Sequence, residues 1–142
     1  MYSKTLTLLI LILFSTQLKV KGQETEYAVV EGIILNNVGD FTASAPINTR
    51  ASFPSAFRSV FIFKGIHKQI FLDELPFKVI KTDRKGHFKV KLEPTIYTFC
   101  IQINGRFIAG NKRRDGYYDF VDCYTTNKHQ IKIVDKSQAR YQ

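Results

Sequence analysis

Basic and tyrosine side chains gather in one stretch of the chain, the basic and aromatic loop predicted over residues 106–124. Guanidinium groups bind carboxylates and phosphates as planar forks, while tyrosine rings stack on sugar faces or fill protein interfaces. This density of both types indicates a site for an anionic ligand or a glycan. A solvated loop with tyrosines packed beside it is the alternative, and the sequence leaves both open. The residues concerned are Arg106, Lys112, Arg113, Arg114, Tyr117, Tyr118 and Tyr124.

Residue patterns that would indicate catalysis are missing from the sequence. The three histidines, His67, His87 and His129, are scattered and have no metal-ligand spacing. No H-x-x-E, H-E-x-x-H or G-x-S-x-G pattern occurs, and no phosphate-binding glycine loop. In the run from Asp83 to Gly86, a lysine stands where a calcium loop would need an oxygen ligand. We therefore predict a protein that is not an enzyme and that holds no metal ion and no cofactor.

The two cysteines, Cys100 and Cys123, are an even number, which favours a disulfide in an oxidising compartment. In a cytosolic chain, two buried free thiols would be the more frequent state. Cys100 has the opposite parity to Phe99 and Ile101 in its strand, so it faces away from the core side of its sheet. A bridge requires the segment around Cys123 to fold back over that outer face, and we predict this structural disulfide.

The N-terminal segment has the order of a secretory signal peptide, with Lys4 followed by an apolar run from Leu6 to Phe14. That run is shorter than the about 20 residues of a membrane span. Cleavage after Gly22 would leave a mature domain of residues 23–142 with no transmembrane span. The alternative is an uncleaved anchor over residues 1–22. We predict export to the periplasm, the cell envelope or the medium.

The chain is strongly basic, with 21 Lys and Arg against 12 Asp and Glu and a net charge of +9. Three lysines leave with the signal segment, so the mature charge is 9 − 3 = +6. Positive charge attracts nucleic acid, anionic glycans or anionic membranes, and it also solvates exposed strand faces. Export argues against nucleic acid. The partners expected are therefore an envelope or extracellular protein, or an anionic glycan.

Short apolar stretches separated by turn signals recur along the mature chain. Residues 87–92 alternate cleanly, with Phe88, Val90 and Leu92 on one face, and residues 96–103 alternate again. A length of 142 residues indicates one domain and excludes a (β/α)₈ barrel, which needs roughly 250 residues. We predict an all-β, antiparallel sandwich of about seven strands with two long loops of unassigned role, residues 38–57 and 65–75. The predicted strands are 28–36, 59–64, 77–82, 87–92, 96–103, 117–125 and 130–134.

The hairpin and the strand after it resemble a known family. The run Thr82-Asp83-Arg84-Lys85-Gly86-His87-Phe88, followed by Val90, Leu92, Pro94 and Tyr97, resembles the carboxypeptidase regulatory-like domain over roughly half of the mature chain. The resemblance implies a transthyretin-like (prealbumin-like) Greek-key β-sandwich and a module without an active site. It also implies structural roles for the motif, which comprises Thr82, Asp83, Gly86, Phe88, Pro94 and Tyr97.

These observations predict an exported, non-catalytic module with a structural or protein-binding role at the cell envelope or outside the cell. One alternative is a glycan-binding module that uses the loop 106–124. Another is an accessory subunit of a separate peptidase.

Overall fold

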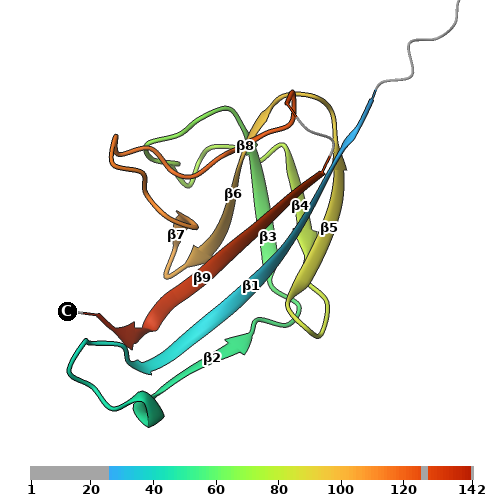
Figure 1. Ribbon diagram of the computed structural model, residues 1–142. Helices are drawn as coiled ribbons and strands as arrows, with labels where there is room; N and C mark the ends of the chain where they lie inside the picture. The colour runs from blue at the N-terminus through green and yellow to red at the C-terminus, as the bar shows by residue number, and fades with distance from the viewer. Residues whose placement is uncertain (1–25, 126–127, 142) are drawn as a thin grey trace, which may run out of the picture.

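The chain folds into two β-sheets that face each other, as a computed structural model of residues 26–125 and 128–141 shows (Figure 1). The predicted signal peptide, residues 1–22, lies outside the described residues. Nine strands and one short 3-10 helix, η1 (Ile47–Thr49), form the described part. The strands are β1 (Ala28–Asp40), β2 (Arg50–Pro54), β3 (Ser59–Lys64), β4 (Lys78–Lys81), β5 (His87–Leu92), β6 (Ile96–Ile103), β7 (Arg106–Ala109), β8 (Val121–Asp122) and β9 (Lys128–Arg140).

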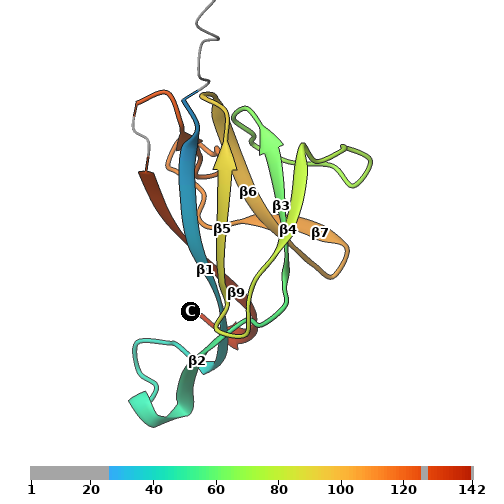
Figure 2. The ribbon, with the colours of Figure 1, turned by 90° about the vertical axis from the view of Figure 1, so that its right-hand side faces the viewer.

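The first sheet is built around β1, the long strand beside β9 in Figure 1. One side of β1 pairs antiparallel with β5 along its first half and with β2 along its second half. The other side pairs with β9, and this pairing is parallel. The far end of β1, with β2 and η1, extends beyond the second sheet (Figure 2).

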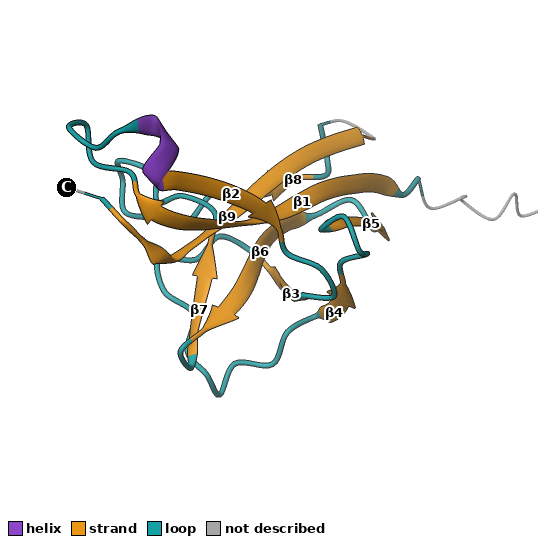
Figure 3. Ribbon diagram, turned by 90° about the horizontal axis from the view of Figure 1, so that it is seen from below, coloured by secondary structure: helices purple, strands orange, loops and turns teal. Residues whose placement is uncertain are grey.

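The second sheet has the order β4-β3-β6, and the far side of β6 pairs with β7 and β8 at its two ends. All of its pairings are antiparallel. In the view of Figure 3, the strands of the second sheet run across the direction of the long strands β1 and β9.

The core lies between the two sheets and is built from the residues that alternation assigned to inner faces. Phe88, Val90 and Leu92 contribute from the first sheet, and Tyr97 and Phe99 from the second. The rings of Phe88 and Phe99 stack across the core with their centroids 5.9 Å apart. The prediction of the inner faces of both strands is confirmed, because side-chain direction alternates in any extended strand, whatever its partners.

The predicted strand number and orientation need correction. The described part of the chain has nine strands in place of about seven, and β9 runs parallel to β1 in place of an antiparallel arrangement. β2 lies inside the predicted loop 38–57, and β7 lies inside the predicted loop 106–124. Of the predicted strand 117–125, only β8 is present. β2 and the polar end of β9 are strands because β1 offers hydrogen-bond partners along its whole length, which an apolar pattern does not reveal.

The predicted hairpin is instead a turn that passes from one sheet to the other, because β4 pairs with β3 whereas β5 pairs with β1. The residues of its motif hold the two sheets together at this end. The buried Thr82 hydroxyl donates to Ser55 O at 2.6 Å and accepts from Arg58 N at 2.8 Å. Asp83 Oδ1 accepts from Lys85 N and His87 N at 2.8 and 2.9 Å. The backbone hydrogen bond from His87 is the main cause that lowers the pKa of the Asp83 carboxyl.

Candidate functional site

A second apolar cluster lies on the outer face of the β4-β3-β6-β7 sheet, away from the main core. Phe63, Cys100 and Phe107 are buried there, and Phe61 is partly buried beside them. The Phe107 ring packs edge-on against Phe61 and Phe63, with centroids 5.0 and 5.1 Å apart. Two loops cover this cluster, and Ile70 of loop 65–77 is buried in it. The sequence allows this second layer because β3 is apolar on both faces.

A pocket of about 780 Å³ opens where the loop 65–77 meets the turn after β6, and we call it the loop pocket. Its lining is apolar for the most part and includes one carboxylate, Asp73; the apolar members are Ile70, Phe71, Leu72, Phe107 and Tyr118. The exposed Arg106 and Lys112 add positive charge to its lining. Its volume lies within the range of about 300–1,000 Å³ that is typical of ligand sites.

The structure brings together only part of the predicted binding constellation. Arg106, Lys112 and Tyr118 line the loop pocket, and Lys112 Nζ lies 5.1 Å from the centroid of the Tyr118 ring. The prediction that these three residues share a site is consistent with their position. The remaining members of the constellation are not part of the pocket lining.

Of those remaining members, Arg113 and Tyr117 contact other side chains of the chain, and Tyr124 is 67% exposed. Arg113 pairs with Asp115 at 3.6 Å and lies over the Phe120 ring at 4.9 Å. Tyr117 is covered by Lys68, whose Nζ is 4.6 Å from the ring centroid. Arg114 is exposed and makes no ion pair with any residue in the described ranges. Because Lys68 occupies one face of the Tyr117 ring, the surface left for stacking a ligand is smaller than the sequence indicated.

Sequence reasoning missed three exposed apolar residues at the tip of the loop 65–77, among them Leu75, the most exposed large apolar side chain of the described residues. Phe71, Leu72 and Leu75 have 57%, 61% and 90% of their surface exposed, and we call these three residues the apolar tip. A turn holds them in place, because Glu74 N donates to Phe71 O at 3.1 Å and Phe71 N donates to Glu74 Oε1 at 2.9 Å. The signal was the apolar content of a loop without strand alternation, which is typical of an interface segment.

Candidate sites elsewhere in the described part of the chain have less to support them. A pocket of about 660 Å³ lies across β1 and β5, but its Glu31 and Lys89 already pair at 2.7 Å. Among residues 26–125 and 128–141, no three His, Cys, Asp or Glu side chains lie together as a metal site would require. Within the same ranges, no helix is long and apolar enough to cross a membrane.

The predicted disulfide is wrong: Cys100 and Cys123 are both free and buried. Cys100 faces the outer cluster with Phe63 and Phe107, as its parity predicted. Cys123 belongs to the main core between the sheets instead. Its backbone N donates to Thr95 O at 2.9 Å, which directs the side chain inward. The two thiols therefore lie in separate apolar clusters.

We predict that neither thiol reacts in the native protein. Burial raises the pKa of Cys123, and burial raises the pKa of Cys100 to about 12, so the nucleophilic thiolate is scarce at neutral pH. Titration with a thiol reagent should detect no free thiol in the folded protein and two in denaturant, without any reductant. Finding none in denaturant would instead reveal a disulfide.

The same burial predicts a loss of stability in alkali. The pKa of Cys100 rises from 9.0 to about 12 on folding, so between these values the unfolded chain binds fewer protons than the folded protein. The free energy of unfolding therefore falls as pH rises through this window, by at most about 1.4 kcal/mol per pH unit. Urea denaturation at several pH values in this window should show that the free energy of unfolding of Cys100→Ala falls less steeply with pH than that of the wild type.

Comparison with known proteins gives little beyond these observations. No protein-family model and no curated protein matches the chain. Among solved structures, a Pseudomonas aeruginosa protein, provisionally described as carbohydrate-binding, aligns with a TM-score of 0.41 and 12% identity. The alignment covers 79% of this chain and 90% of that protein. This similarity is too low to transfer that protein's ligand to the chain.

Proposed function

We propose that this protein is an exported, non-catalytic binding module that holds a partner protein over its apolar tip and loop pocket. In this proposal the fold is the transthyretin-like Greek-key sandwich of carboxypeptidase regulatory-like domains. The hairpin motif supports that assignment through its structural contacts: Thr82 bonds the neighbouring loop, and Phe88 and Tyr97 lie in the core.

The observation that carries the proposal is the exposure of large apolar side chains next to positive charge. Phe71 and Leu72 belong to a hydrogen-bonded turn, Leu75 follows it, and all three are exposed. Arg106 and Lys112 line the pocket beside them. Exposed apolar clusters beside polar residues are typical of protein interfaces, where aromatic residues and arginine are enriched.

An anionic glycan is the second candidate ligand, and the cations of the loop pocket favour it. Arg106 is exposed and makes no ion pair within the described ranges, so its guanidinium is open to a carboxylate or sulfate group. The apolar tip favours a protein over a glycan, because sugar rings do not use the aliphatic side chains of Leu72 and Leu75 as stacking surfaces.

The test removes the apolar tip and leaves the fold intact. The double variant Leu72→Ser, Leu75→Ser should lose the partner that the wild-type protein captures from its native envelope fraction. It should keep the wild-type melting temperature, because both side chains are exposed. Phe53→Ser is the matched control, since Phe53 is similarly exposed but belongs to β2 of the other sheet.

Capture that is unchanged by the double variant would contradict the proposal. Salt-sensitive retention on heparin that is lost in the double variant Arg106→Ala, Lys112→Ala would favour the glycan. A peptidase as the captured partner would identify the protein as an accessory subunit.

A further inference from the structure

The composition of the loop pocket suits an occupant that is apolar and carries a carboxylate. Its apolar lining lies beside two exposed cations, Arg106 and Lys112, and one exposed carboxylate, Asp73, so the lining keeps an excess of positive charge. Lys112 lies over Tyr118, and no acidic side chain of the described chain pairs with either cation. An apolar side chain would fill the pocket, and a neighbouring carboxylate would neutralise the two charges.

The chain itself presents a segment of this composition at the edge of the same pocket. Asp73 lies between Leu72 and Leu75 in the loop 65–77, and it is exposed without an ion pair inside the described ranges. The neighbouring carboxylate, Glu74, is already held by Phe71 N at 2.9 Å. The segment therefore offers two leucines and one uncommitted carboxylate, which are the groups that suit the pocket.

We propose that the occupant of the loop pocket is a second copy of this chain, in a two-fold dimer in which each copy inserts Leu72 and Asp73 into the pocket of the other. This inference rests on the proposed function and names the partner of that same surface. Leu72 and Asp73 also line the pocket of their own chain, so donor and acceptor lie side by side. A two-fold axis through such a surface matches each donor with the partner's acceptor, and the assembly closes at two copies.

The charges of the tip favour a second copy over a lipid surface. The positive side chains and the leucines would suit an anionic membrane, but Asp73 and Glu74 would enter the same negative interface. In the dimer, Asp73 meets Arg106 of the other copy, so the carboxylate that disfavours the membrane stabilises the pair.

A charge exchange between two variants tests the dimer. The wild-type protein should sediment as a dimer at micromolar concentration, whereas Asp73→Lys and Arg106→Glu should each weaken the dimer by about tenfold or more. An equimolar mixture of the two variants should recover a dimer. One of its reciprocal contacts pairs the introduced lysine with the introduced glutamate, and the other keeps the original aspartate and arginine. Both positions are exposed, so the variants should melt like the wild type.

The control is Asp115→Lys, which makes the same charge change on the loop after β7, outside the pocket, and should leave the dimer intact. A wild-type protein that is monomeric throughout the micromolar range would overturn the dimer. Sedimentation with phosphatidylserine vesicles that depends on Leu72 would replace it by a membrane surface. Neither result decides the proposed function, which fails only if partner capture survives the loss of Leu72 and Leu75.

Discussion

Replacing Gly86 by alanine should destabilise the protein by about 3 kcal/mol, because strain and a steric clash act together. Gly86 has a φ of +74°, a backbone conformation that L-residues adopt at a cost. A Cβ atom there would lie 2.7 Å from Ile34 O and 3.0 Å from Ser55 N, and both are backbone atoms. Ile34 N donates to Gly86 O at 2.9 Å, so the turn cannot move away without losing its bond to β1.

Gly105 provides the matched control for this prediction. Its φ of +72° is nearly the same, but a Cβ atom would meet nothing within 4 Å. Gly105→Ala should therefore cost only the backbone strain of about 1 kcal/mol. Urea denaturation of the two variants separates the strain from the clash. Equal losses would show that the contact with β1 and the neighbouring loop relaxes freely, contrary to the prediction.

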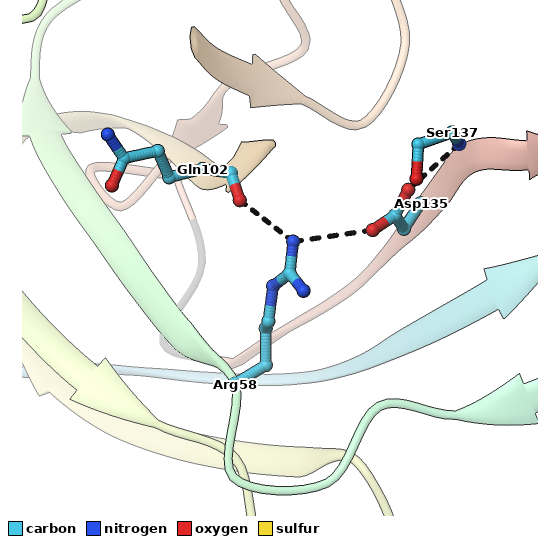
Figure 4. A network of polar contacts seen from close by, with 4 residues as sticks. All are labelled: Arg58, Gln102, Asp135 and Ser137. Carbon is cyan, nitrogen blue, oxygen red and sulfur yellow. Dashed lines mark hydrogen bonds and ion pairs between the residues drawn. The ribbon is translucent and has the colours of Figure 1, made fainter. Parts of the chain in front are cut away.

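Replacing Arg58 by methionine should cost about 2–3 kcal/mol, because it leaves a buried carboxylate without its cation. Figure 4 shows Arg58 between the two sheets, where its Nη2 donates to Gln102 O at 2.8 Å and to Asp135 Oδ2 at 3.3 Å. The Asp135 side chain is only 9% exposed, and its other oxygen accepts from Ser137 N at 2.9 Å. The Arg58 side chain is 31% exposed, which keeps the expected loss below that of a fully buried pair.

A double-mutant cycle measures this pair. Asp135→Asn retains an oxygen for Ser137 N but removes the charge, so the double variant Arg58→Met, Asp135→Asn should be more stable than Arg58→Met alone. Lys89→Met is the control, because it breaks the exposed pair with Glu31 and should cost less than about 1 kcal/mol. Thermal or urea melts in which Arg58→Met is no more destabilising than Lys89→Met would contradict the role assigned to Asp135.

The inner faces of the central strands could be predicted from the sequence, because strand parity is a local property. Phe88 and Val90 in β5, and Phe99 and Ile101 in β6, all lie in the main core. The turn glycine could be predicted for the same reason, since the left-handed residue at position 86 belongs to the tight turn in which Gly86 N donates to Asp83 O at 3.1 Å.

The pairing of distant segments could not be predicted in this way. The end of β9 is polar from residue 135 onward, yet it continues as a strand because the backbone of β1 pairs with it. β2 forms inside a stretch that contains Pro46 and Pro54, since the far end of β1 has an otherwise unpaired side. In both segments the backbone hydrogen bonds of a neighbour outweigh the local composition.

The path of the chain also decided where the two cysteines and the residues of the candidate site lie. Parity placed Cys100 on the outer face correctly, but whether Cys123 reached it depended on the route of the chain after β7. The sequence singled out Arg106 and Lys112 by their type, whereas only the folded loops show that these cations share a pocket. The exposure of Leu72 and Leu75 was likewise decided by the tertiary structure, because composition shows that a loop is apolar but does not show which side faces solvent.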